Sequence, residues 1–116
     1  MRPLYWMIPV VALAVAIVAN MASACEVNGE KDGLPALNSC PADVVTFLNR
    51  AVMCQYFAGE FGGDGSARDA EVAKELTTRK CDVLQSEKAA IDKKYATDAA
   101  VKKTITKVFS DFGIEF

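Results

Sequence analysis

Four cysteines, Cys25, Cys40, Cys54 and Cys81, are the side chains of this sequence whose type and spacing could do chemistry. None lies in a Cys-x-x-Cys motif, which disfavours a thioredoxin-like redox site. The sequence contains no histidine, and together with the wide cysteine spacing this disfavours a structural zinc site. Cysteines of a small domain in an oxidising compartment form disulfides by default. We therefore expect structural cysteines, with no cofactor and no metal.

The pairing of the cysteines depends on two predicted helices, near residues 41–57 and 67–95. If these helices form an antiparallel hairpin around the glycine-rich turn between them, facing residues lie at similar distances from that turn. Cys40 and Cys81 come close to this condition, whereas Cys54 and Cys81 are offset by several ångström, and bridgeable pairs need Cα atoms within about 7 Å. Cys40–Cys81 is therefore the first choice, and a bent second helix or a folded-back loop would favour Cys54–Cys81.

Cys25 has a second candidate chemistry, which is lipid attachment. The run Ala22-Ser23-Ala24-Cys25 resembles a bacterial lipobox, in which the cysteine is acylated and becomes the mature N-terminus, although Leu is usual in place of Ala22. Acylation would leave three thiols and one bridge, whereas ordinary cleavage after Ala24 leaves four thiols and two bridges. We favour the lipoprotein, and Glu26 in second position favours an outer-membrane destination by resemblance.

The first 24 residues have the pattern of a secretory signal peptide. A short basic start precedes an apolar stretch, and small residues stand where a signal peptidase cuts. The alternative is an uncleaved anchor, since about 20 apolar residues can span a bilayer. Mostly acidic residues follow the apolar stretch, without a basic cluster, and this favours cleavage. We expect an exported, periplasmic protein whose contact with a membrane is made only through the lipid anchor.

Length and composition exclude several classes of protein. The chain has 116 residues, of which 52% are hydrophobic, and its net charge is −2. These values exclude a multidomain enzyme, a polytopic membrane protein and a disordered chain. An exported acidic chain is also a poor candidate for nucleic-acid binding.

Behind the leader, residues 25–39 predict a flexible tether and residues 40–116 a helical domain. Apolar residues recur at three- and four-residue steps in the domain, and no alternating run suggests strands. The second helix is either continuous or kinked at Thr77-Thr78. Asp98 or Thr97 can cap a last helix that ends at Gly113. The predicted fold is all-α, a small disulfide-stapled bundle of three to four helices.

A candidate binding loop begins at the end of the first helix of the domain. Without histidine, carboxylates are the remaining general acid–base candidates, and Glu60 between Phe57 and Phe61 is the best of them. A solvated carboxylate is the simpler interpretation. The loop residues that we single out are Tyr56, Phe57, Glu60 and Phe61.

The glycine-rich run after this loop does not match a known ligand-binding motif. Residues 62–66 lack the lysine of a phosphate-binding loop and the ligand spacing of a calcium loop. Ser66, with Asp69 three residues later, approximates a capping box for the next helix.

The run from Cys40 to Ala51 has the sequence Cys-Pro-Ala-Asp-Val-Val-Thr-Phe-Leu-Asn-Arg-Ala. It is followed by Cys54, by the Phe-Ala-Gly-Glu turn that ends at Glu60, and by Cys81. This pattern resembles a family of small uncharacterised exported proteins of proteobacteria, whose members often have His where this chain has Tyr56. The resemblance implies membership but no activity, because the family has none established. A looser similarity is to disulfide-bonded envelope domains of the lysozyme-inhibitor type.

Three hypotheses follow. The first is a non-enzymatic envelope protein that binds a protein partner, with a lysozyme-like enzyme as one candidate. The second is a small envelope enzyme that uses Glu60 or another carboxylate beside the glycine-rich loop. The third is a structural or stress-related envelope component without a discrete ligand.

Overall fold

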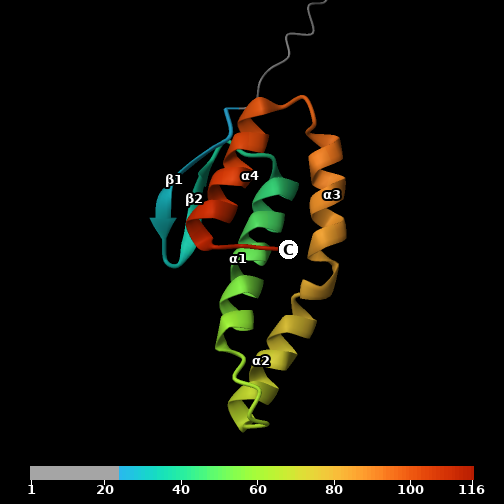
Figure 1. Cartoon of the computed structure of the whole chain (residues 1–116). Helices are drawn as coiled ribbons and strands as arrows, with labels where there is room; N and C mark the ends of the chain where they lie inside the picture. Colours follow the sequence, from blue (N-terminus) through green and yellow to red (C-terminus); the bar gives the residue numbers. More distant parts are fainter. Residues whose placement is uncertain (1–23) are drawn as a thin grey trace, which may run out of the picture.

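The computed structural model describes residues 24–116, so that residues 1–23 of the predicted leader lie outside the described part. The described chain is mostly helical, as predicted, but it also contains a two-stranded sheet (Figure 1). The elements are β1 (Glu26–Lys31), β2 (Leu34–Asn38), α1 (Ala42–Glu60), α2 (Ala67–Thr78), the one-turn 3₁₀ helix η1 (Cys81–Val83), α3 (Leu84–Lys94) and α4 (Ala99–Phe112).

Helix α1 is the central element of the fold, lying between the sheet and α4 on one side and α3 on the other (Figure 1). Its apolar residues follow the helical repeat and share one buried stripe. The buried members are Val44, Phe47, Leu48, Ala51, Val52 and Cys54. The second half of α1 projects beyond the sheet and pairs with α2 and η1, so the molecule has a broad end and a narrow end (Figure 1).

Helices α2 and α3 are separated by a break, in agreement with the kinked alternative. The break falls at Arg79-Lys80, two residues after the predicted kink, and Lys80 adopts a left-handed conformation with φ 53°. Helix α4 has both predicted ends. Asp98 Oδ1 accepts the Val101 N–H at 3.1 Å, and Gly113 ends the helix with φ 63°, a conformation that glycine adopts without strain.

The flexible tether predicted for residues 25–39 is wrong, because this segment is a β-hairpin. Strands β1 and β2 are antiparallel, with Lys31 opposite Leu34. The two residues between them, Asp32 and Gly33, have φ values of 56° and 78°. An Asp-Gly pair with positive φ at both positions is a favoured two-residue hairpin connection. Val27 of β1 is buried, and β1 lies against α4, so the hairpin is part of the core.

The disulfides differ from the first choice made from the sequence. The structure pairs Cys25 with Cys40 and Cys54 with Cys81, at Cα–Cα distances of 4.2 and 5.7 Å. Cys40–Cys81 is therefore not formed, and the second choice, Cys54–Cys81, is. The reason is the loop at residues 61–66, which continues past the end of α1 before α2 begins and so shifts the facing positions (Figure 1).

The lipid attachment predicted at Cys25 is corrected by the same finding. The Cys25 sulfur is bonded to Cys40, and one sulfur cannot also carry an acylglyceryl thioether. The alternative with four thiols and two bridges is the one that the structure has. Two disulfides are typical of a protein from an oxidising compartment. Within residues 24–116, no helix combines the length and the apolarity needed to cross a bilayer.

Candidate functional site

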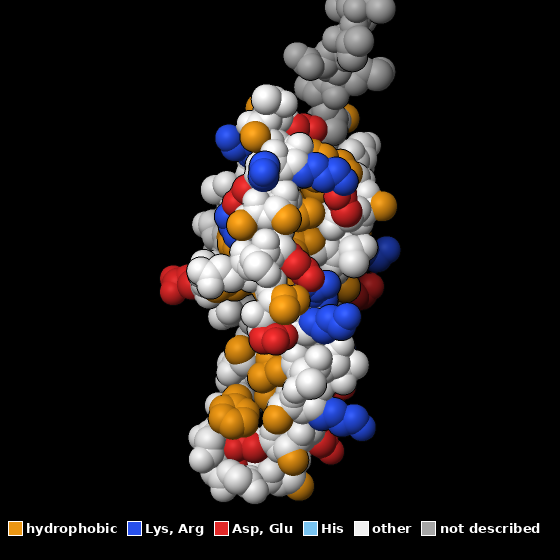
Figure 2. Space-filling model, turned by 90° about the vertical axis from the view of Figure 1, so that its right-hand side faces the viewer, with side chains coloured by type: hydrophobic (Ala, Val, Ile, Leu, Met, Phe, Trp, Pro, Cys, Tyr) orange, Lys and Arg blue, Asp and Glu red, His pale blue; other side chains and the backbone are white. Residues whose placement is uncertain are grey.

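The four residues predicted as a binding loop lie at the narrow end of the molecule, which we call the hairpin tip (residues 56–66). Only Phe61 follows the helix, because α1 continues to Glu60 and so includes Tyr56, Phe57 and Glu60. Tyr56 and Phe61 are 53% and 52% exposed, although aromatic side chains of this size usually bury most of their surface. Tyr56 follows the buried Cys54 by two positions and therefore faces away from the core. Figure 2 shows hydrophobic side chains at the surface of this end.

Phe57 is held between two neighbours. Its ring meets that of Tyr56 edge to face, with centroids 5.2 Å apart. On the other side, the guanidinium carbon of Arg79 lies 5.2 Å from the Phe57 centroid, a distance at which cation–π attraction operates. The Arg79 Nε–H also donates to Glu75 Oε2 at 3.1 Å, which fixes the guanidinium in place.

A buried carboxylate organises the loop of the tip. Asp69 is 6% exposed, and its oxygens accept the backbone N–H groups of Gly62 at 2.9 Å, Asp64 at 2.7 Å and Gly65 at 3.2 Å. Hydrogen bonding of this kind offsets the cost of removing a carboxylate from water. The sequence predicted only the helix cap, which is present, since Ser66 Oγ accepts the Asp69 N–H at 3.2 Å.

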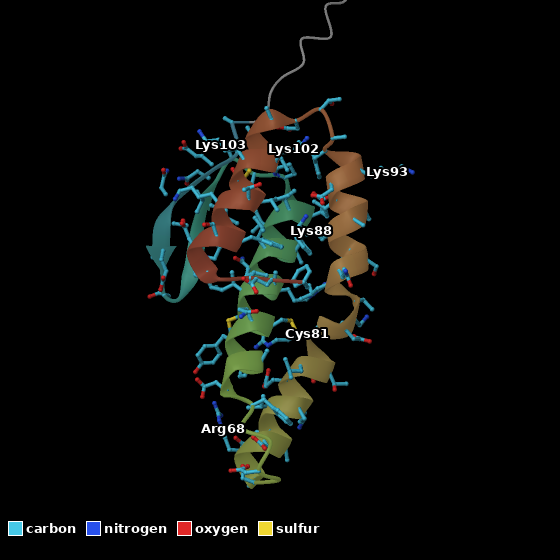
Figure 3. All side chains as sticks on the ribbon, viewed as in Figure 1. Arg68, Cys81, Lys88, Lys93, Lys102 and Lys103 are labelled. Atoms are coloured by element: carbon cyan, nitrogen blue, oxygen red, sulfur yellow. A yellow bond between two sulfur atoms is a disulfide. The ribbon has the colours of Figure 1, made fainter. Side chains whose placement is uncertain are left out.

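The Cys54–Cys81 disulfide lies directly behind the tip and joins α1 to η1 (Figure 3). It fixes the chain at η1, directly after α2, against α1. The hydrogen bonds of Asp69 hold the loop before α2, and the disulfide holds the segment after α2. The exposed aromatic side chains are therefore attached to a part of the fold that is fixed at both ends of α2.

Glu60 occupies the exposed end of α1. Its carboxylate lies 3.8 Å from Arg68 Nη2, and the two side chains are 45% and 53% exposed. Arg68 extends beside this end of α1 in Figure 3. Glu60 is thus a solvent-facing partner in an ion pair, which agrees with the simpler interpretation of this carboxylate. In residues 24–116, no three His, Cys, Asp or Glu side chains gather as a metal site requires.

The backbone N–H groups of the glycine-rich loop are directed inward. Those of Gly62, Asp64 and Gly65 donate to Asp69, and that of Ser66 donates to Asp64 Oδ1 at 2.9 Å. The hydrogen bonds from Ser66 lower the pKa of Asp64 below its ordinary value. These four donors are therefore used within the protein and do not form an anion-binding nest.

A second polar cluster, which the sequence did not reveal, joins the start of α1 to the end of α3. Asp43 accepts the Tyr95 hydroxyl at 2.6 Å and the Lys94 ammonium at 2.7 Å. Both hydrogen bonds lower the pKa of Asp43, and the one from Lys94 has the larger effect. The same carboxylate raises the pKa of Lys94 and of Tyr95. The participants are about fifty positions apart, so no local motif could have indicated the cluster.

A shallow groove of about 410 Å³ runs from Asp43 along the interface of α1 and α3. Phe47 and Ile91 line its middle, and the Arg50–Glu87 ion pair lies at its other end. The charged side chains at both ends of the groove are thus paired within the protein. The groove follows the line along which α3 packs against α1.

Comparison with protein-family models, with curated proteins and with solved structures finds no match for this chain.

Proposed function

We propose that this chain is an exported, disulfide-stapled helical module that binds another protein through its hairpin tip. The observation that supports this most directly is the exposure of Tyr56 and Phe61, each by more than half, on a tip held by Asp69 and the Cys54–Cys81 bridge. Rigid exposed aromatic side chains are the anchors that protein interfaces use most, because they bury much area at little cost in conformational entropy.

The chemistry around the tip indicates what kind of partner fits. Residues 55–75 contain five acidic and two basic side chains, and one of the acidic ones, Asp69, is used internally. The exposed remainder is still acidic, so the complementary surface is an apolar pocket with a basic rim. We propose a basic protein of the periplasm as the partner, and the lysozyme-like enzyme suggested by the looser similarity is one candidate of this class.

Site-directed photocrosslinking in the cell envelope tests the proposal. The chain is expressed with its own leader, and a photoreactive phenylalanine analogue replaces either Tyr56 or Phe61. The matched control carries the same analogue at Phe116, which is 47% exposed but packs against Phe109 of α4, away from the tip. We expect one discrete adduct with a basic protein from both tip positions and none from Phe116.

The adduct is then examined for specificity. A Phe61→Ser substitution should abolish the adduct formed from position 56, and the purified partner should bind the native chain in solution. Equal adducts from all three positions would contradict the proposal, and so would an adduct that is a second copy of this chain.

Catalysis by Glu60 has less support than partner binding. The carboxylate is exposed and paired with Arg68, whereas a general acid or base is usually tuned by burial or by a like charge. If deletion of the gene has a phenotype, a Glu60→Gln chain should restore the normal state as well as the native chain does.

A further inference from the structure

Lysines are concentrated toward the broad end of the molecule, opposite the hairpin tip. The segment 88–107, which covers most of α3, the α3–α4 connection and the first half of α4, contains six lysines and two aspartates. The chain as a whole has a net charge of −2. Figure 2 shows several Lys and Arg side chains at the upper end of the molecule.

Three of these lysines have no carboxylate partner among the described residues. The other three are paired, as Lys88–Asp92, Lys94–Asp43 and Lys107–Asp111. Lys93 and Lys103 are exposed and unpaired in the described structure, and Lys102 Nζ reaches only the Ala96 carbonyl at 3.5 Å. Lys102 and Lys103 lie at the start of α4, and Lys93 extends outward near the end of α3 (Figure 3). We call Lys93, Lys102 and Lys103 the lysine end.

Two carboxylates near the lysine end have hydrogen-bond partners of their own: Asp98, between Lys93 and Lys102 in the sequence, and Glu26, which lines the same groove as Lys103. Asp98 caps α4 through the Val101 N–H, and Glu26 at the start of β1 accepts the side-chain amide of Asn28 at 3.2 Å. Both carboxylates also reduce the positive charge of this end.

The chain enters the fold at this same end. Thr104 of α4 donates its hydroxyl to the Cys25 carbonyl at 3.1 Å, a buried hydrogen bond. Ala24 and Cys25 line one groove together with Lys103 and Lys107. The 21 residues before Cys25 form an apolar sequence that is long enough to enter a bilayer. If this sequence enters a bilayer, the lysine end lies beside the point where the chain joins the folded domain and therefore faces the membrane.

We propose that the lysine end docks reversibly on the headgroups of anionic phospholipids. Basic side chains near such a surface are attracted by its negative potential, over a distance limited by salt screening. This orientation directs the hairpin tip away from the bilayer, because the tip lies at the opposite end of the molecule (Figure 1). A domain released from its leader would then remain at the membrane surface with its aromatic tip accessible to a partner.

Vesicle co-sedimentation of residues 25–116 tests the proposal, since this part contains the core, the sheet and both disulfides. We expect binding to vesicles of phosphatidylcholine with phosphatidylglycerol, loss of binding as salt is raised, and none to phosphatidylcholine alone. The triple variant Lys93→Gln, Lys102→Gln, Lys103→Gln should bind about 100-fold more weakly, because each lysine near an anionic surface contributes about fivefold.

The matched control removes the same charge from other surfaces, through Lys31→Gln, Lys74→Gln and Lys80→Gln. It should bind nearly as well as the native domain, and both triple variants should keep the native unfolding temperature. Equal losses in the two triple variants would overturn the proposal, because net charge alone would then explain binding. Binding to a nucleic acid of equal charge density without binding to the vesicles would also overturn it. The tip variant Tyr56→Ser, Phe61→Ser should retain vesicle binding, which separates this test from that of the proposed function.

Discussion

The Tyr95 hydroxyl donates a 2.6 Å hydrogen bond to Asp43 Oδ1, and this contact joins the end of α3 to the first turn of α1. Lys94 donates to the other oxygen of the same carboxylate at 2.7 Å. Helix α3 buries few of its residues, chiefly Leu84 and Ile91. The polar contacts at its end therefore contribute more to its position than they would on a helix with a continuous apolar face.

Loss of this contact should destabilise the fold measurably. We expect Asp43→Asn and Tyr95→Phe each to lower the free energy of unfolding by about 1 kcal/mol, the usual net value of a hydrogen bond of this type. The double variant should cost less than the sum of the single ones, because both remove the same contact. Urea unfolding measures all three, and Lys88→Gln, which breaks an exposed ion pair within one helix turn, should cost about 0.5 kcal/mol or less. Strict additivity of Asp43→Asn and Tyr95→Phe would contradict the prediction.

The same cluster predicts how stability depends on pH. The pKa of Asp43 is lowered from its ordinary 3.8, so the stabilisation is present above that pH and is lost as the pH falls through the lower folded value. The pKa of Tyr95 is raised from 10.0 and that of Lys94 from 10.5, so their contributions are present below these values and are lost as the pH rises further. Urea titrations at acidic and alkaline pH measure the free energy of unfolding as a function of pH. In Asp43→Asn this free energy should fall less steeply than in the native chain at both low and high pH, and an unchanged pH dependence would refute the assignment.

Asp69, at the start of α2, should be the carboxylate on which the loop of the hairpin tip depends most. Asp69→Ala leaves three backbone N–H groups without their acceptor, and we expect a loss of about 2 kcal/mol in unfolding free energy. Amide hydrogen exchange at Gly62, Asp64 and Gly65 should accelerate together. The control Glu71→Ala removes a carboxylate whose side chain is 73% exposed and should leave both measurements nearly unchanged. Retained protection of the three amides in Asp69→Ala would show that the loop does not depend on this carboxylate.

The disulfides can be checked by the intact mass, with and without reduction, of the protein purified after expression with residues 1–24 in place. We expect a chain that begins at Cys25, carries no acyl group and gains the mass of two hydrogens for each of two bridges on reduction. Replacing Cys54 and Cys81 by Ala should cost about 3.5 kcal/mol, and replacing Cys25 and Cys40 about 3 kcal/mol, because the first pair closes the longer loop. An acylated Cys25 would contradict the pairing with Cys40.

Local signals predicted the parts of the fold that depend on neighbouring residues. The Asp98 cap, the Gly113 stop and the Ser66 cap are each formed by side chain and backbone groups within a few positions of one another. The grouping of the tip residues was predictable for the same reason, since Tyr56 to Phe61 lie within two turns of chain.

The remaining features require distances that the sequence alone does not supply. Asp43 and Tyr95 are brought together by the antiparallel course of α1 and α3, and no pattern at either residue indicates the other. The correct disulfides depend on how far the loop at 61–66 extends past α1, and the prediction placed its turn too early. The strands were not predicted because only one residue in each is buried, so that the sequence shows no hydrophobic alternation. The Asp32-Gly33 pair is the one local signal that could have indicated them.

Two glycine substitutions should therefore have opposite effects. Gly33→Ala places a side chain at φ 78° in the hairpin turn, and we expect it to lower the free energy of unfolding by about 1 kcal/mol, although a Cβ there would meet no neighbour. Gly59→Ala lies within α1, at an ordinary φ and also without a close neighbour, and should raise the stability by about 0.5 kcal/mol because alanine is the better helix former. Since both sites are sterically open, the difference in sign isolates the backbone conformation as the cause. Thermal unfolding of the two variants measures it, and a stabilising Gly33→Ala would mean that residues 26–38 do not form the hairpin.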